Sequence, residues 1–233
     1  MAGPGPDRPL TRQTGSPVDL TVWFDYHCPY SQRAVEWLLG LGREVVRPRF
    51  RPFPLEQVNH DPAAAEWRLW EQPLDYLQYR GRQDRRSLAG FLATALLEAT
   101  EAGPVVDRFR LAVYRARFEE QADIADLELL ERLAEGAGAD AAHLAAAVTS
   151  DAALGAARAT IADAWRDARA EWAIFGVPTL QPAGEPPFYL RLERAVAPGA
   201  EALELFARLL DLRRAAPFVV EIKLPERADG VEG

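Results

Sequence analysis

Strand patterns lie near the two ends of this chain, and helical patterns fill the long stretch between them. Residues 18–26 alternate between apolar and polar positions and predict a strand, and residues 45–53 form a second extended run. Prolines interrupt the second run, which is typical of an edge strand because proline donates no ladder hydrogen bond. From about 55 to 172, apolar residues recur at the spacing of helices. Strand patterns return at 177–181 and 188–191 around a turn-rich segment, which predicts a hairpin.

These patterns divide the chain into four parts. Residues 1–17 are rich in Gly, Pro and polar residues and are expected to form a disordered tail. Residues 18–54 form a β-α-β half, and residues 55–172 form an inserted helical domain. Residues 173–233 supply a β-β-α half with a C-terminal extension. The sequence therefore predicts an α/β fold whose two halves are separated by helices.

Composition limits the classes of partner. The net charge is -8 and the isoelectric point is about 5.1, which argues against a nucleic-acid partner because phosphate backbones require a basic face. The chain has no apolar run long enough to span a membrane, and residues 1–17 lack the apolar core of a secretory signal. A single cysteine cannot form an internal disulfide, so we expect a cytoplasmic protein. One cysteine and three scattered histidines predict no structural metal site.

Cys28, the only cysteine, follows the first predicted strand and precedes Pro29. Apolar residues at helical spacing then predict a helix over 29–41. Proline is favoured in the first turn of a helix, so Cys28 is expected at a helix N-terminus. Free backbone N–H groups there favour a thiolate and lower a cysteine pKa from about 8.5 to roughly 3.5–7.5. The alternative is that Cys28 is a small buried apolar residue, as lone cysteines usually are.

Three neighbours could assist Cys28. Ser31 lies one helical turn away and can either donate a hydrogen bond to a thiolate or cap the helix. His27, if protonated, would favour a thiolate, and if neutral could act as a base. Neighbours in an extended segment point in opposite directions, so contact between His27 and Cys28 is not assured. Tyr30 can line a pocket, donate its hydroxyl to a substrate, or simply pack.

Two clusters early in the helical stretch have a structural and a functional interpretation. The aromatic cluster, which either packs in the core or forms a substrate wall, comprises Trp67, Trp70, Tyr76 and Tyr79. The arginine cluster, which is either a solvated face or a site for the carboxylates of a thiol cofactor, comprises Arg80, Arg82, Arg85 and Arg86.

Three motifs resemble the DsbA-like family. Cys28-Pro29-Tyr30-Ser31 stands where that family has its Cys-x-x-Cys site, Gly176-Val177-Pro178-Thr179 is similar to its Gly-Val-Pro-Thr segment, and residues 118–126 are similar to an acidic stretch of its inserted helices. The similarity extends over about residues 18–214. It implies a thioredoxin-like fold with a helical domain inserted between the two halves. It further implies that Pro178 follows a cis peptide bond and that the Val177 backbone binds an extended substrate beside Cys28.

The sequence departs from the family at Ser31, which replaces the second cysteine. The segment is also similar to the Ser-Pro-Tyr-Ser of kappa-class glutathione transferases and 2-hydroxychromene-2-carboxylate isomerases. These resemblances imply three hypotheses. The first is a thiol–disulfide oxidoreductase in monothiol mode, the second a thiol-cofactor-dependent transferase or isomerase, and the third a non-catalytic binding module with a buried Cys28.

The first hypothesis assigns a role to each site residue. The catalytic residues would be Cys28 and Ser31, supported by His27, Pro29 and Tyr30, and the substrate-binding residues would be Val177 and Pro178. The substrate would be a disulfide-containing small molecule or protein. No tightly bound cofactor is expected, although a low-molecular-weight thiol would serve as co-substrate. Whether the chain forms a homodimer stays open.

Overall fold

The structure is a computed structural model that describes residues 16–60, 66–76 and 86–221. Most of the tail predicted to be disordered therefore lies outside the described residues. The chain divides into two compact units, Met1–Ala195 and Val196–Gly233. The first unit contains the sheet, the helices that lie between its strands in sequence, and the candidate site.

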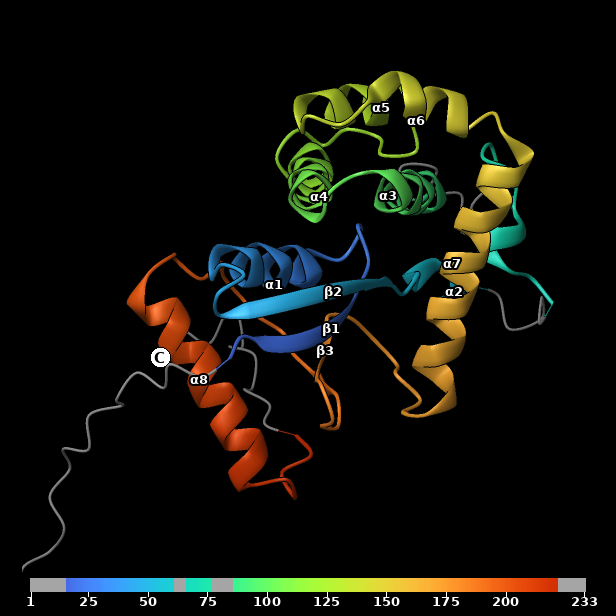
Figure 1. The fold of residues 1–233 in the computed structure, drawn as a ribbon. Coiled ribbons are helices and arrows are strands. Elements are labelled where there is room, and N and C mark those ends of the chain that lie inside the picture. Colours follow the sequence, from blue (N-terminus) through green and yellow to red (C-terminus); the bar gives the residue numbers. More distant parts are fainter. Residues whose placement is uncertain (1–15, 61–65, 77–85, 222–233) are drawn as a thin grey trace, which may run out of the picture. The chain divides into compact units, whose positions relative to one another are not determined.

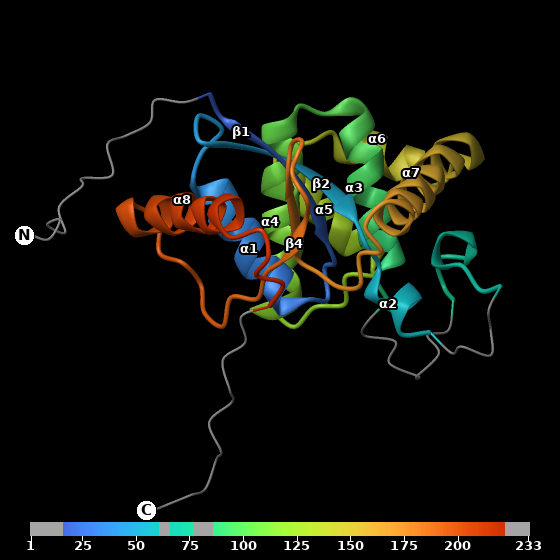
Figure 2. The ribbon, with the colours of Figure 1, turned by 90° about the horizontal axis from the view of Figure 1, so that it is seen from below.

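A four-stranded sheet with the order β2-β1-β3-β4 organises the first unit (Figures 1 and 2). β1 (Val18–Phe24) pairs in parallel with β2 (Val46–Pro52), which lies at the edge as its prolines predicted. β3 (Thr179–Pro182) runs antiparallel to β1, with Val22 opposite Leu180. β4 (Phe188–Tyr189) runs antiparallel to β3, which confirms the predicted hairpin.

α1 (Pro29–Gly40) connects β1 to β2. Pro29 occupies its first turn and Cys28 is its N-cap, so the local signals located the start of this helix correctly. The apolar stripe of the helix, represented by Ala34, Val35 and Leu38, is fully buried. Gly42, just beyond the helix, has a φ of +85°, a conformation that favours glycine.

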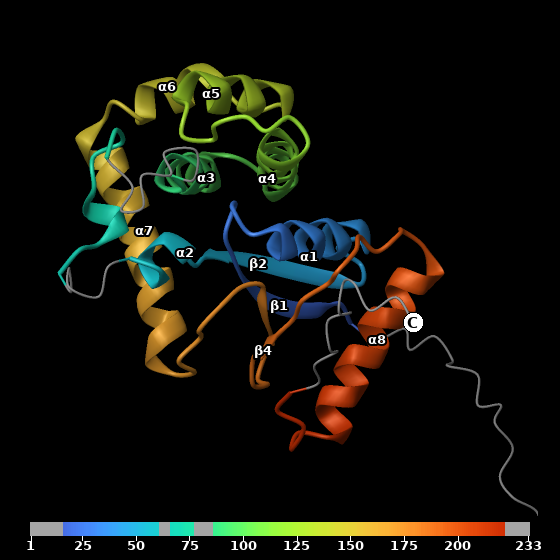
Figure 3. The ribbon, with the colours of Figure 1, turned by 180° about the vertical axis from the view of Figure 1, so that it is seen from behind.

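Helices occupy the chain between β2 and β3. They are α2 (Leu55–Val58), the 3-10 helix η1 (Leu69–Glu71), α3 (Leu88–Thr100), α4 (Gly103–Phe118), α5 (Leu127–Gly136), α6 (Ala141–Ala147) and α7 (Asp151–Ala170). α4 packs against α1, and α3 packs against both α4 and α7. α5 and α6 lie on α3 and α4, on the side away from the sheet (Figures 1 and 3). The domain boundaries at 54/55 and 172/173 stay predictions.

Packed aromatic rings join α3 and α4 to the segment that follows β1. The ring of Tyr26 lies 5.5 Å from that of Phe91 on α3 and 5.2 Å from that of Tyr114 on α4. Its hydroxyl shares a 2.5 Å hydrogen bond with Thr94 on α3. These side chains are all buried, so the segment after β1 is held from the helical side.

The second unit contains α8 (Ala200–Ala215), which follows Gly199 at a φ of +124°. Its buried positions are Ala202, Phe206 and Leu210. Within residues 16–60, 66–76 and 86–221, no helix combines the length and apolar character that a membrane crossing requires.

Candidate active site

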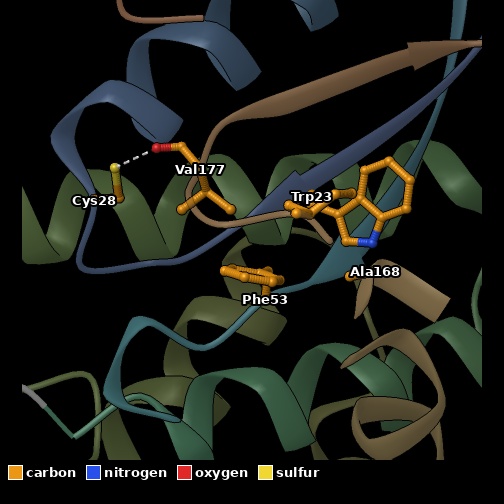
Figure 4. Packing of buried hydrophobic residues seen from close by; sticks show 6 residues of the cluster. Trp23, Cys28, Phe53, Ala168 and Val177 are labelled. Carbon is orange, nitrogen blue, oxygen red and sulfur yellow. Dashed lines mark hydrogen bonds between the residues drawn. The ribbon is translucent and has the colours of Figure 1, made fainter. Parts of the chain in front are cut away.

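Cys28 lies between the end of β1 and the start of α1. Its backbone N–H donates to the carbonyl of Asp25 at 3.2 Å, which closes a tight turn before the helix. Its sulfur accepts a hydrogen bond from the backbone N–H of Ser31 at 3.4 Å, as an N-cap side chain does. The thiol in turn donates to the carbonyl oxygen of Val177 at 3.3 Å (Figure 4). The peptide bond between Val177 and Pro178 is cis. The two motifs are therefore in direct contact.

Burial dominates the chemistry of the sulfur. Cys28 is only 4% exposed and belongs to an apolar cluster with Trp23, Phe53, Ala168, Ile174 and Val177. Figure 4 shows Phe53 and Trp23 on the far side of Val177 from the sulfur. Burial raises the pKa of Cys28 above its ordinary value, and this effect outweighs the hydrogen bonds from Ser31, which lower it.

The expectation of an accessible thiolate with a lowered pKa is therefore wrong for this conformation. The helix N-terminus is present, but the cost of removing a charged sulfur from water is larger than the gain from its N–H groups. The non-catalytic alternative predicted such burial. The sulfur nevertheless has two polar partners, the Ser31 N–H within its own turn and the Val177 carbonyl 149 residues away.

Ser31 faces the sulfur from within α1. It is fully buried, and its hydroxyl lowers the pKa of Cys28 by hydrogen bonding. The same hydroxyl oxygen accepts a hydrogen bond from the backbone N–H of Asp25 at 3.4 Å. The two expected roles, contact with the sulfur and satisfaction of backbone N–H groups, thus occur together. Whether Ser31 is catalytic stays a prediction.

The sequence also matches the model of a known protein family. The model of the DSBA-like thioredoxin domain matches residues 19–211. The chain belongs to this family. This membership confirms the predicted α/β class, a DSBA-like thioredoxin fold with helices inserted between the β-α-β and β-β parts.

Solved structures share the DSBA-like fold at low sequence identity. A putative protein disulfide isomerase from Nitrosomonas europaea aligns with a TM-score of 0.53 and 17% identity, covering 86% of this chain and 98% of that chain. A probable DsbA oxidoreductase from Streptomyces coelicolor aligns with a TM-score of 0.55 and 19% identity, covering 93% of this chain and 97% of that chain. The cytosolic disulfide reductase DsbM from Pseudomonas aeruginosa aligns with a TM-score of 0.53 and 19% identity, covering 83% of this chain and 99% of that chain. No curated protein matches the chain.

His27, next to the cysteine of this DSBA-like site, is bound at both ring nitrogens. Nε of Arg117 donates to Nδ1 at 2.9 Å, and Nε2 lies 3.2 Å from the carbonyl oxygen of Arg86. A guanidinium only donates, so Nδ1 must be unprotonated, and Nε2 must carry the proton that it donates to the carbonyl. This arrangement matches the neutral form of His27, one of the two forms expected, and a supporting role for His27 stays a prediction.

Tyr30 is half-buried and packs against the apolar cluster around Cys28. Arg191 donates a hydrogen bond to its hydroxyl, and the guanidinium carbon lies 4.1 Å from the ring centroid. The guanidinium carbon of Arg33 lies 5.5 Å from the same centroid. Tyr30 thus links the start of α1 to the segment after β4.

Asp25 is the central residue that the sequence did not single out. Its buried carboxyl accepts from the backbone N–H of His27 at 2.6 Å through Oδ1 and from that of Leu55 at 2.8 Å through Oδ2. Burial raises its pKa to about 7, although these two hydrogen bonds lower it. The carboxyl fixes the Cys28 turn to the start of α2. A signal was present, because Asp25 ends the apolar run Val22-Trp23-Phe24 three residues before the cysteine.

The aromatic cluster of the helical stretch packs on neighbouring side chains where it is described, and its role as a substrate wall stays untested. Trp67 stacks on His60 with ring centroids 3.8 Å apart, and Tyr76 donates to Glu56 at 2.5 Å. The ring of Trp70 lies 6.1 Å from that of Trp165.

The rest of that cluster and most of the arginine cluster, namely Tyr79, Arg80, Arg82 and Arg85, lie outside the described residues. Arg86 forms an ion pair with Asp123 at 3.6 Å. Across the described part of the chain, no three His, Cys, Asp or Glu side chains form a group that could hold a metal ion.

Proposed function

We propose that this DSBA-like protein catalyses thiol–disulfide exchange in monothiol mode through Cys28. The observation that supports it is the pair of contacts on the sulfur, from the Ser31 N–H on one side and to the Val177 carbonyl on the other. The first is a donor that stabilises a thiolate. The second places a backbone acceptor from a different segment at the reacting atom, where an extended substrate can form a hydrogen bond.

The exchange has two steps. Cys28 loses its proton to solvent, and the thiolate attacks one sulfur of a disulfide R–S–S–R′. A bond forms between Cys28 and the R sulfur, the R′ thiolate leaves, and it takes up a proton from solvent. A second, low-molecular-weight thiol then attacks the R sulfur as its thiolate and releases the Cys28 thiolate. Ser31 has no sulfur, so the second step requires this external thiol.

The proposal also assigns a role to burial. With the Val177 carbonyl bonded to the thiol, the protein holds Cys28 in its protonated and unreactive form. Deprotonation removes the hydrogen that this carbonyl accepts, so Val177 becomes available to an N–H of the substrate. Because the second step consumes reduced small thiol, we place the reaction in the cytoplasm.

The test is reduction of a small disulfide by an external thiol, followed with wild-type protein, Cys28→Ser and Ser31→Cys. Cys28→Ser should fall to the uncatalysed background. Ser31→Cys in its reduced form should reduce protein disulfides without a second thiol, and should end with an internal disulfide, visible as a loss of two hydrogens by mass spectrometry. The thiol-cofactor transferase or isomerase would instead retain thiol-transfer activity in Cys28→Ser, since the similar enzymes have serine there.

A further inference from the structure

Two exposed aromatic side chains flank the segment that contacts Cys28. Phe175 is 68% exposed and Tyr189 is 39% exposed, and their ring centroids are 5.3 Å apart. A Cβ at Gly176 would lie 3.4 Å from Tyr189 Cε2, so the ring rests directly on the chain that leads to Val177. Large apolar side chains exposed together in this way are typical of a binding surface.

Two arginines supply positive charge beside these rings. Arg191, two residues after Tyr189, has a side chain that is 42% exposed and bonds Tyr30 through Nη2. Its acidic neighbour is Glu193, whose carboxylate is 3.7 Å away and 77% exposed. Arg33 lies on the same tyrosine and donates to the carbonyl of Leu192 at 2.8 Å. We call Tyr30, Arg33, Phe175, Tyr189 and Arg191 the aromatic–arginine wall.

The wall lies beside the sulfur. Tyr30 packs against the apolar cluster that contains Cys28, and Phe175 is two residues before Val177, whose carbonyl the thiol contacts. The protein as a whole has a net charge of -8 and should repel anions at long range. The wall itself carries two guanidiniums, those of Arg33 and Arg191, and Arg191 pairs with Glu193. Arginine donates charge-assisted hydrogen bonds to carboxylates, and the contacts of Arg191 to Tyr30 and Glu193 both involve Nη2, so a substrate carboxylate would bind through Nη1 or through Nε.

We propose that the aromatic–arginine wall selects small disulfides that carry a carboxylate close to the sulfur attacked by Cys28. This inference rests on the proposed exchange reaction and names its substrate class. The carboxylate binds Arg191, the apolar part of the molecule packs on Phe175 and Tyr189, and the attacked sulfur faces Cys28.

The experiment compares three disulfides of similar size and different charge: 3,3′-dithiodipropionate, its uncharged diamide and cystamine. The rate at which each forms a mixed disulfide on Cys28 is followed by intact mass spectrometry without any external thiol. The wild-type protein should react about tenfold faster with the dianion than with the diamide, and slowest with cystamine, a difference of about 1.4 kcal/mol. Added salt should reduce the preference.

Variants at Arg191 separate charge selection from reactivity. R191A should bring the ratio of dianion to diamide rates close to one, and R191E should invert it. R166A is the matched control, because Arg166 is also exposed and paired with a carboxylate, that of Asp163 at 2.8 Å, but is not one of the wall residues; its ratio should equal that of wild type. Thermal unfolding of each variant checks that it folds.

The outcomes distinguish this inference from the proposed function. A ratio near one in the wild type, or one that R191A does not alter, overturns the role of the wall while the exchange reaction stands. Failure of all three disulfides to react at Cys28 in the folded protein, when the urea-unfolded chain does react, overturns the proposed function and this inference with it.

Discussion

The thiol of Cys28 donates a hydrogen bond to the carbonyl oxygen of Val177, 149 residues further along the chain, at 3.3 Å. This contact brings together the helix N-terminus of the first half and the segment that leads into β3. It keeps the proton on the sulfur, whereas the N–H and hydroxyl of Ser31 favour its removal. The reactivity of the site is therefore decided by the balance between these groups and burial.

The first prediction concerns the pH dependence of Cys28 alkylation. Because burial raises the pKa of the thiol, the rate of reaction with iodoacetamide should keep increasing above pH 9 in the folded protein. The urea-unfolded chain should level off near the ordinary thiol value of about 8.5. A folded-state profile that levels off near pH 6 or 7 would show instead that the thiolate is stabilised.

The second prediction concerns Ser31. Ser31→Ala removes the hydroxyl that lowers the pKa of Cys28 but keeps the backbone N–H. The thiolate fraction at pH 8 should fall by a factor of about three to ten, which corresponds to half to one pKa unit. Alkylation rates report this directly. The matched control is Ser31→Thr, which retains a hydroxyl and should therefore lie closer to wild type than Ser31→Ala.

The third prediction concerns stability as a function of pH. The pKa of Asp25 is about 7 in the folded protein and 3.8 as its ordinary value, so folding favours the protonated carboxyl. Its contribution to stability is fully present below pH 4 and is lost as the pH rises through 7. The free energy of unfolding in urea should therefore decrease between pH 4 and 8. Glu56 and Glu98, whose pKa values burial also raises, act in the same direction.

Asp25→Asn isolates the part of the pH dependence of stability that is due to the Asp25 carboxyl. The amide cannot accept from both His27 and Leu55 as the carboxylate does, so the variant should be less stable overall. Its stability should nevertheless depend less steeply on pH than that of the wild type. Equal slopes in the two proteins would assign the pH dependence to other groups.

The fourth prediction concerns the contact between the inserted helices and β1. Tyr26→Phe removes the hydroxyl that shares a hydrogen bond with Thr94 and leaves the ring packing intact. The Thr94 hydroxyl still donates to the carbonyl of Gly90. The variant should lose about 1 kcal/mol of unfolding free energy. A much larger loss, measured by urea unfolding, would show that the ring itself has moved.

The parts of the site that depend on neighbouring residues were predictable from the sequence. Cys28 as the N-cap and Pro29 in the first turn follow from the preferences of a helix start, and the hairpin follows from two short strands around a turn. Contact between Cys28 and Val177 was expected only through the resemblance to a family, because residues so far apart in sequence share no local pattern.

The charge state of the site was not predictable, since distant residues set it. Phe53 and Ile174 help to remove the Cys28 sulfur from water, and neither lies near it in sequence. The partners of Asp25 and His27 likewise come from α2 and α4. Local pattern gives the donors of a helix terminus, but the desolvation that opposes them is known only once the chain has folded.

The anchoring of the turn around Asp25 and His27 determines from which direction a reactant can arrive. Hydrogen bonds hold this turn to Leu55 on α2 and to Tyr114 and Arg117 on α4. They restrict any movement of the turn that would carry the Cys28 sulfur outward. The opposite lip, at Phe175 and Gly176, is the more exposed one. An incoming molecule would therefore uncover Cys28 by displacing Phe175 and Gly176, while the turn around Asp25 and His27 stays in place.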